Sequence, residues 1–476
     1  MLPSAPETSA LRRDLAALVT GGRASDDDAD RVAYARDLWP RHQIATRAGV
    51  AAVAPPAVVV WPSRVEEVAA VVRYAAERRI PLVPFGAGSG VCGGVLPTPE
   101  TILLDTKRMR HITGFDADRL TCRVEAGMVG QHLEDALEER GFTLGHFPSS
   151  IYCSTVGGWL AARSAGQCSG RYGKIEDMAL GLTCVDGTGS IWRAERDGEN
   201  AALLPLVIGS EGILAVVTDA TLRIATAPRE RRFASYVFPS VEAGVEAMRR
   251  IYQGDLRPAV ARLYDPFDSM IKRTGGLRKR ASGGDAPSPP ASRMGERLGL
   301  GALARALRRP ALLNELIDWV PDRVMGGANL VLVWESDAAI ADAELAVARG
   351  LCERLGATDS GEGPARQWLA HRHSVSYRQS PMLKAGAFLD TMEVAATWSR
   401  LLPMYRAMRE ALAEHVFVMA HFSHAYPDGA SIYFTFAGSA KDDGAAMEAY
   451  DRTWCVALDG VVRAGGTLSH LHGVGR

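Results

Sequence analysis

The sequence predicts an α+β protein built from two domains. Its 476 residues exceed the roughly 100–200 residues that are typical of one domain. Between residues 57 and 85, a short apolar run, a stretch with helical periodicity and a second apolar run form a β–α–β unit. The apolar pattern resets near residues 225–228. We therefore expect an N-terminal segment over 1–50, a first domain over 51–226 and a second domain over 227–476.

Short apolar runs and turn residues assign the elements of the first domain. The run 57–61 is rich in β-branched residues and stops at Pro62, which predicts a buried strand. Ser63 is expected to cap a helix whose apolar residues follow a helical spacing and whose first turn carries Glu66 and Glu67. Further strands are predicted at 80–85, 102–105, 120–125 and 214–224, and a helix is predicted at 131–140.

The second half is predicted to alternate helices and strands, with a basic insertion at 272–309. That insertion holds ten Lys and Arg residues against two acidic residues. Two interpretations stay open: a solvated loop, or a segment that contacts an anionic membrane surface through a basic amphipathic helix at 299–316. Helices are predicted at 242–251 and 338–355, and strands at 330–334, 389–393, 416–421 and 432–436.

Composition excludes several classes of protein. The 54 Lys and Arg residues nearly balance the 55 Asp and Glu residues, which argues against a nucleic-acid-binding protein. No apolar run approaches the ~18 residues of a membrane-spanning helix, and no charged leader precedes an apolar core at the start. Seven cysteines without a CxxC pair argue against a disulfide framework and a zinc site. A cytoplasmic protein, with peripheral membrane contact and homodimer formation left open, is expected.

A glycine-rich loop follows the second predicted strand. Residues 88–93 formally match GxGxxG, but Pro97 and Pro99 prevent the helix that a nicotinamide dinucleotide site requires. A loop of this kind can instead turn its backbone N–H groups inward as a nest for phosphate. Two further glycine-rich patches occur at 154–159 and 209–214. Three such loops in one domain indicate an extended dinucleotide.

Four segments together resemble a known family. VPFGAGSGVCGG, STVGGW, RYGKIEDM and IGSEGILAVVTDATLRI occur in the order seen in flavoproteins of the vanillyl-alcohol oxidase / p-cresol methylhydroxylase superfamily. The resemblance implies a two-subdomain FAD-binding domain of the p-cresol methylhydroxylase (PCMH) type, followed by an α+β cap domain for the substrate. It implies noncovalent FAD, with the pyrophosphate near 86–90, the flavin along 148–154 and 161–164, and the adenine near 211–217. The implied cofactor-binding residues are Pro84, Phe85, Gly86, Ala87, Gly88, Ser89, Gly90, His146, Pro148, Ser149, Ser154, Thr155, Gly157, Gly158, Ala161, Arg163, Ser164, Glu211, Gly212 and Val217.

Within this superfamily, the second half most resembles alkylglycerone-phosphate synthases. The resemblance rests on DGASIYFTF at 428–436 and GGTLSHLHGVG at 465–475. It implies a small, lipid-like substrate: flavin N5 attacks the carbon of an acyl-dihydroxyacetone phosphate, the acyl chain leaves, and a fatty alcohol replaces it without net change in flavin oxidation state. Tyr433 would be the acid/base, with a core strand aromatic as the alternative. His470 and His472 would match two positions of a histidine triplet and could bind a phosphate or shuttle a proton at the catalytic site, with an exposed tail as the alternative. Arg378 or Arg262 would bind the phosphate of the substrate, with surface arginines as the alternative.

Other activities stay open at this point. Relatives that oxidise D-2-hydroxy acids such as lactate or glycolate use a His and a Glu in a metal site, where this chain has Tyr433 and Leu471, so no metal is expected. His421 and His424, spaced i and i+3, could form half of a metal site. Cys153 could link a flavin covalently, as in other relatives. Because family members continue beyond the histidine motif, the end of the chain at residue 476 also leaves open an FAD-binding protein without catalytic activity.

Overall fold

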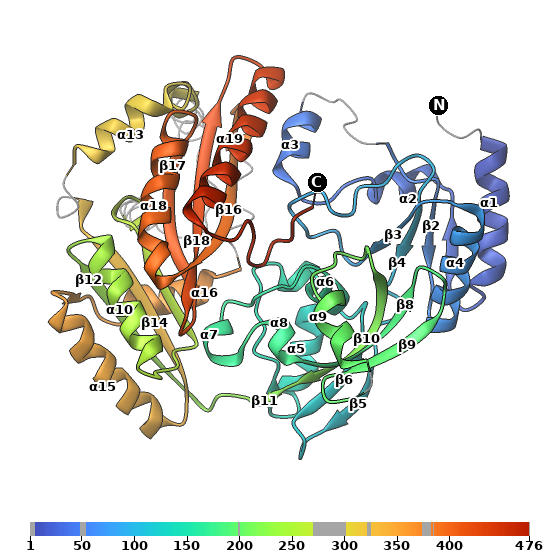
Figure 1. Ribbon diagram of the computed structural model, residues 1–476, viewed down its shortest axis with the longest axis horizontal. Coiled ribbons are helices and arrows are strands. Elements are labelled where there is room, and N and C mark those ends of the chain that lie inside the picture. The colour runs from blue at the N-terminus through green and yellow to red at the C-terminus, as the bar shows by residue number, and fades with distance from the viewer. Residues whose placement is uncertain are drawn as a thin grey trace, which may run out of the picture.

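The computed structural model describes residues 5–47, 54–198, 200–269, 301–320, 325–373, 382–383 and 385–475. The chain forms two bodies of sheet and helix that lie side by side, and the C-terminal residues run between them (Figure 1). The predicted α+β class is confirmed. The helices covering the large second sheet come from residues 241–253, 338–354, 398–413 and 443–464.

The first sheet carries the predicted β–α–β unit. Its strand order is β1-β2-β4-β3, and β4 pairs in parallel with both β2 and β3. The helix of the unit begins one residue later than predicted: its N-cap is Arg64, while Ser63 donates its backbone N–H and its hydroxyl to the Glu67 carboxylate at 2.8 and 3.2 Å. The elements are β1 (Arg23–Ser25), β2 (Val58–Trp61), α4 (Val65–Arg78), β3 (Leu82–Phe85) and β4 (Ile102–Asp105).

The N-terminal segment is helical and links the two halves of the molecule. Its helices are α1 (Ala5–Leu18), α2 (Asp28–Ala33) and α3 (Pro40–Arg47). The Asp37 carboxylate accepts the N–H of Gly93 in the glycine-rich loop at 2.8 Å. Arg41 donates two hydrogen bonds to the carboxylate of Asp451 in the second half, at 2.8 and 2.9 Å. The segment therefore braces the glycine-rich loop against the second half.

A second, antiparallel sheet completes the first half. Its strand order is β5-β6-β10-β8-β9, so β10, the last of these strands in the chain, pairs between β6 and β8. The strands are β5 (Ile112–Asp116), β6 (Thr121–Glu125), β8 (Ala179–Asp186), β9 (Ile191–Glu195) and β10 (Ala215–Arg223), and β7 (Phe142–Thr143) pairs separately with β11 (Ala225–Thr226). The connecting helices are α5 (Gly130–Glu138), η1 (Ile151–Cys153), α6 (Val156–Ala161), α7 (Ser169–Tyr172), α8 (Ile175–Met178), η2 (Ala201–Leu203) and α9 (Leu204–Val207).

The second half is built on a seven-stranded sheet of order β15-β12-β14-β13-β17-β18-β16. Side chains alternate between its faces: Leu330, Leu332 and Trp334 pack on the helices, whereas Val331 and Val333 join the core of the first half. The strands are β12 (Glu230–Phe238), β13 (Val260–Tyr264), β14 (Ala328–Ser336), β15 (Thr358–Asp359), β16 (Ala387–Thr397), β17 (Phe417–Ala425) and β18 (Gly429–Ser439). The helices are α10 (Val241–Gln253), α13 (Pro310–Asp318), α15 (Ala338–Arg354), α16 (Gly363–His371), α18 (Trp398–Ala413) and α19 (Asp443–Ala464).

The basic insertion lies outside the described residues up to position 300. The helix predicted over 299–316 is wrong as a single element, because residues 301–306 are helical and α13 starts separately at Pro310. Proline lacks the N–H of a continuing helix and is favoured in the first helical turn, so it starts a second helix here. Leu307 and Leu313 pack against Phe417 of the sheet. Among the described residues, no helix is long and apolar enough to cross a bilayer.

Candidate active site

One large cavity is lined by both halves of the molecule. It has a volume of about 1780 Å³, which exceeds the roughly 300–1,000 Å³ of a typical single-ligand pocket. The first half contributes the glycine-rich loop, the segment 148–167 and the segment 207–217. The second half contributes side chains of the sheet, of α16 and of the C-terminal segment. A cavity of this size and composition has room for a dinucleotide and a second molecule.

The glycine-rich loop forms a wall of exposed backbone. Within the described part of the chain, no hydrogen bond uses the backbone N–H groups of residues 87–91. Gly88 has a φ of +66°, and a Cβ atom there would lie 2.5 Å from Cζ of Phe85. A Cβ on Gly86 would lie 2.4 Å from Oγ1 of Thr155. The absence of side chains therefore keeps the loop close to its neighbours and leaves five N–H groups free for an anion, which suits the pyrophosphate of FAD.

Polar side chains of the same wall also lack protein partners. The Oγ atom of Ser210 and the Oε1 atom of Gln167 are buried, and neither has a hydrogen-bond partner among the described residues. Both residues line the cavity. Because a buried polar atom without a partner is costly, these atoms indicate a polar ligand along this wall. The wall accordingly fits FAD.

Most of the residues predicted to bind the cofactor line this cavity. Glu211 lines it too, but its carboxylate accepts the N–H groups of Val474 and Gly475 at 2.6 and 3.0 Å, so it holds the C-terminal segment. The cavity-lining residues from the predicted set are Pro84, Phe85, Gly86, Ala87, Gly88, Ser89, Gly90, Pro148, Ser149, Ser154, Thr155, Gly157, Gly158, Ala161, Ser164, Glu211, Gly212 and Val217.

Two predicted cofactor residues, His146 and Arg163, do not line the cavity. His146 is fully buried behind it, and its Nε2 atom lies 2.7 Å from Oγ of the lining residue Ser164. Burial lowers the pKa of His146 to about 3, so the ring is neutral. Arg163 turns away and donates to the carbonyl oxygens of Pro205 and Ile208. Neither side chain is therefore placed to contact FAD directly. Each one instead lies behind the wall of the cavity.

Three polar side chains of the second half form a row across its sheet. Glu393 on β16 lies opposite Tyr433 on β18, and Tyr433 lies opposite His421 on β17. Their sequence neighbours, such as Ile432 and Phe434, face the helices, so the alternation of the strands turns this row toward the first half. The rings of His421 and Tyr433 stack with centroids 4.8 Å apart. Tyr433 thus lines the cavity and does not belong to the helix-covered core.

Arg262 also faces the cavity, beside this row. Its guanidinium donates to Nε2 of His421, whose Nδ1 lies 3.5 Å from the Asp268 carboxylate. Arg262 therefore presents a positive charge to the cavity. His421, which lies beside the Asp268 carboxylate, helps to hold that charge in place. Arg372, which sequence reasoning missed, lines the cavity as well and lies over the Phe147 ring at 4.5 Å. Arg378, the other predicted phosphate ligand, lies outside the described residues.

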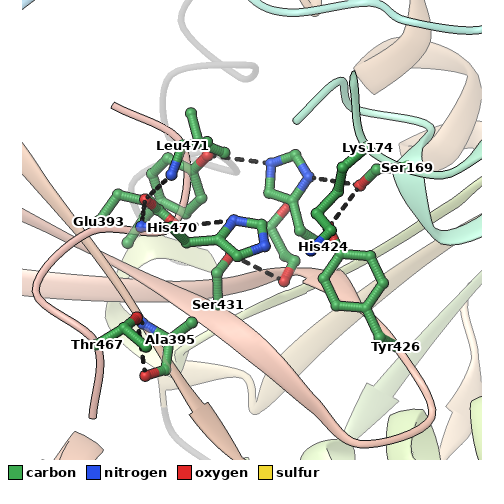
Figure 2. Close-up of polar contacts among 12 residues, drawn as sticks. Ser169, Lys174, Glu393, Ala395, His424, Tyr426, Ser431, Thr467, His470 and Leu471 are labelled. Atoms are coloured by element: carbon green, nitrogen blue, oxygen red, sulfur yellow. Dashed lines mark hydrogen bonds and ion pairs between the residues drawn. The ribbon is translucent and has the colours of Figure 1, made fainter. Parts of the chain in front are cut away.

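The C-terminal segment borders the cavity and is held by the buried carboxylate of Glu393 and the half-buried carboxylate of Glu211. The Glu393 carboxylate accepts the N–H groups of His470 and Leu471 at 2.9 and 3.1 Å (Figure 2). His472 and Leu471 line the cavity, whereas the His470 ring packs against Tyr426 with centroids 5.6 Å apart. The exposed-tail alternative therefore does not describe this segment. Sequence reasoning missed Glu393, although its place between Met392 and Val394 in a predicted strand, one acidic residue between two apolar ones, could have indicated it.

Two alternative predictions concern metal and covalent chemistry. His421 and His424 both line the cavity, but no group of three or more His, Cys, Asp and Glu side chains in the described ranges is arranged to hold a metal ion. Cys153 lines the cavity at the end of η1, and its thiol is free.

The fold and this cavity define a two-part flavoprotein, in which the first half provides the wall that fits FAD and the large sheet of the second half faces that wall. Models of two families match the chain: the FAD binding domain over residues 56–195 and the C-terminal domain of FAD linked oxidases over residues 227–476. The second match covers more than half of the chain, and the protein belongs to the FAD-linked oxidase family. The prediction of FAD as cofactor is confirmed, and the protein is an FAD-dependent enzyme.

Individual relatives agree with the predicted resemblance. The alkyldihydroxyacetonephosphate synthase of Dictyostelium discoideum is 26% identical over 97% of this chain and 74% of its own length. The D-lactate dehydrogenase of Archaeoglobus fulgidus is 32% identical, but over only 48% of this chain and 50% of its own length. A solved structure of an alkyldihydroxyacetonephosphate synthase superimposes with a TM-score of 0.75 and 25% identity, over 94% of this chain and 78% of that one. The structure of p-cresol methylhydroxylase shares the fold, with a TM-score of 0.69, 16% identity, and coverage of 98% of this chain and 90% of its own.

Proposed function

We propose that this protein exchanges the acyl chain of an acyl-dihydroxyacetone phosphate for the alkyl chain of a fatty alcohol. The observation that carries the proposal is that one cavity joins the FAD-holding wall to Tyr433, His472 and Arg262. The relatives support it, because similarity to the synthases extends over nearly the whole chain, whereas similarity to the D-lactate dehydrogenase stops at about half.

The two proposed substrates together bring a phosphate, an acyl chain and an alkyl chain, and the cavity has surface suited to each. Arg262 would bind the phosphate, for which a planar guanidinium provides paired donors. The alkyl and acyl chains require apolar surface, and the cavity is lined by Leu38, Val95, Leu389 and Met419 among others. Its volume of about 1780 Å³ leaves space beyond that of a cofactor. FAD, when bound, supplies the reactive N5 edge at the substrate carbon.

Tyr433 would hold and move the proton of the reaction at its hydroxyl oxygen. Burial, together with the Glu393 carboxylate, raises the pKa of Tyr433 well above its ordinary value, so the hydroxyl is protonated at neutral pH. A protonated phenol can donate to the departing carboxylate, and the oxygen left behind can accept the proton of the incoming alcohol. His472, whose ring centroid lies 5.9 Å from that of Tyr433, borders the same space. In these low-dielectric surroundings a net charge is costly. Returning the same proton to the Tyr433 hydroxyl is therefore favoured over leaving a charge in the site.

The proposal is tested by incubating the FAD-loaded protein with a palmitoyl-dihydroxyacetone phosphate and hexadecanol. The expected result is release of palmitate and formation of the alkyl product, while the flavin absorbance stays that of the oxidised form. The Tyr433→Phe variant is expected to keep its FAD and to exchange roughly 10²–10⁴-fold more slowly, the usual contribution of a general acid or base, which leaves a measurable residual rate. Release of palmitate without alkyl product, or no reaction by FAD-loaded protein, would refute the proposal.

The alternative activity is oxidation of a D-2-hydroxy acid, which the partial similarity to the D-lactate dehydrogenase favours. It is distinguished by adding D-lactate or glycolate without oxygen. Bleaching of the flavin by either acid would support the dehydrogenase, because hydride transfer reduces the cofactor. Full FAD occupancy with no reaction on either substrate class would refute both of these activities.

A further inference from the structure

His424 is held in an unusual backbone conformation beside the candidate catalytic tyrosine. Its φ is +44°, in the left-handed region that residues with a side chain rarely adopt. It sits where the pairing of β17 with β18 shifts register, between Ser423 and Ala425. Bulges of this kind redirect a side chain, and strained residues that persist are held by their surroundings. The bulge allows His424 to face the cavity although it is out of phase with His421.

Both ring nitrogens of His424 have a hydrogen-bond partner. Nε2 lies 3.0 Å from the hydroxyl oxygen of Tyr433, and Nδ1 lies 3.0 Å from Oγ of Ser169. Ser169 belongs to α7 in the first half, and its hydroxyl also lies 3.0 Å from that of Tyr426 (Figure 2). The chain of hydrogen bonds therefore runs from the first half, through His424, to Tyr433 in the second half.

The His424 ring is neutral, which restricts how this chain can be arranged. Burial first, and then the electrostatic effect of nearby side chains such as His470 and Arg262, holds the pKa of His424 well below its ordinary value. A neutral imidazole has one donor nitrogen and one acceptor nitrogen. If Ser169 donates to Nδ1, then Nε2–H donates to Tyr433, and the hydroxyl hydrogen of Tyr433 is free to point into the cavity. If Nδ1–H donates to Ser169, Tyr433 must donate to Nε2 and presents only lone pairs to the cavity.

We propose that His424 and Ser169 are positioning residues that set whether Tyr433 presents a hydrogen or a lone pair to the substrate. The proposal rests on the role of Tyr433 in the proposed function. It assigns to Ser169, a residue of the FAD-holding half, a part in the chemistry of the substrate-facing half. Tyr433 is thus oriented only when the two halves are docked, because neither half contains the whole hydrogen-bond chain.

Other titratable groups surround His424, and their protonation would also contribute to a measured pH profile of activity. The His470 ring is 5.8 Å away between centroids, and Lys174 lies over the Tyr426 ring at 5.6 Å. The groups that act on His424, Tyr433 or Tyr426 are Lys174, Asp177, Tyr252, Arg262, Glu393, His421, Tyr426, His470 and His472.

The first test compares Ser169→Ala with Ser169→Thr in the FAD-loaded protein. Ser169→Ala removes one oxygen atom, and we expect kcat to fall about tenfold with KM unchanged, as for loss of one net hydrogen bond. Ser169→Thr keeps the hydroxyl and should restore most of the rate. Ser439→Ala, at the far end of β18 from the site, is the control. In a Tyr433→Phe background, Ser169→Ala should have no further effect, because the two residues act through one hydroxyl. An equal effect in both backgrounds would overturn the proposal.

The second test does not depend on turnover. Nitrogen-15 NMR of histidine-labelled holoenzyme reports the protonation of each ring nitrogen, and the His424 signals are identified by their loss in His424→Asn, a residue that tolerates left-handed backbone. We expect a neutral ring whose Nδ1 signal shifts in Ser169→Ala and whose Nε2 signal shifts in Tyr433→Phe. A charged ring at neutral pH, or an Nδ1 signal unaffected by Ser169→Ala, would overturn the proposal. If the protein fails to form alkyl product, only the proposed function fails, and this measurement still decides the hydrogen-bond chain.

Discussion

The hold of Glu393 on the C-terminal segment can be tested by removing its charge. Glu393→Gln keeps the shape of the side chain, so the amide oxygen can still accept the N–H groups of His470 and Leu471. Hydrogen bonds to a charged acceptor are roughly twice as strong as those between neutral groups. Weakening each of the two hydrogen bonds by about 1 kcal/mol lowers the free energy that attaches the segment by about 2 kcal/mol. Glu393 is only 3% exposed, so water cannot compensate for the weaker bonds.

A loss of about 2 kcal/mol corresponds to about a 30-fold larger population of detached segment. Amide hydrogen exchange measured by mass spectrometry on peptides that contain residues 467–475 reports this population directly. We expect exchange there to accelerate about 30-fold in Glu393→Gln, while α4 exchanges at its original rate. Glu353→Gln, which changes an exposed glutamate on α15, is the control. Unchanged exchange at 467–475 would refute the assignment of Glu393 as the anchor of the segment.

Three further predictions follow from buried, strained and exposed groups. Burial raises the pKa of Asp390 to about 7, so the folded protein binds its proton more tightly than the unfolded chain, and stability should fall as the pH rises from about 4 to about 7. Asp390→Asn should remove this part of the pH dependence in urea unfolding measured at pH 5 and pH 7, and an unaltered dependence would contradict the assignment. Gly88→Ala should reduce the ratio of flavin to protein absorbance, because φ is +66° and the new Cβ would lie 2.5 Å from Cζ of Phe85; Gly187→Ala, with no atom within 4 Å, should leave it unchanged. Arg41 and Asp451 are 31% and 46% exposed, so a double-mutant cycle in thermal unfolding should give a coupling below about 1 kcal/mol, and a value above 2 kcal/mol would show that the bridge is more than a surface pair.

Local patterns predicted the glycine-rich walls and the strands β2, β3, β4, β6, β10, β14, β16, β17 and β18. The strands β5, β8, β9, β12 and β13, among others, were not predicted. Buried strands such as β2 and β4 consist of uninterrupted β-branched and aliphatic residues, a pattern that needs no distant partner to be recognised. The helices α18 and α19 were not predicted. Pro403 lies inside α18, and Gly460 and several β-branched residues lie inside α19, and these residues lower the local preference for helix. Packing of both helices on the large sheet outweighs that preference.

The residues of the candidate site likewise fall into those that local motifs predicted and those that they did not. Tyr433, His472 and most of the glycine-loop residues were predicted, because short motifs contain them. Ser169 and Glu393 were not, since their partners lie 255 and 77 positions away in the chain. No local pattern encodes such a pair.

The sequence by itself determined the class of the protein, the cofactor and the order of the motifs. Glycine-rich motifs and apolar runs of strand length are patterns of neighbouring residues, and they can be recognised whatever the rest of the chain does. The tertiary structure alone decided which polar side chains meet. The register of β16, β17 and β18 sets Glu393, Tyr433 and His421 in one row, and the docking of the two halves brings Ser169 to His424. The physical reason is that the orientation of a side chain follows from the pairing of whole strands and from the packing of whole domains, and both are sums over many residues far apart in the chain.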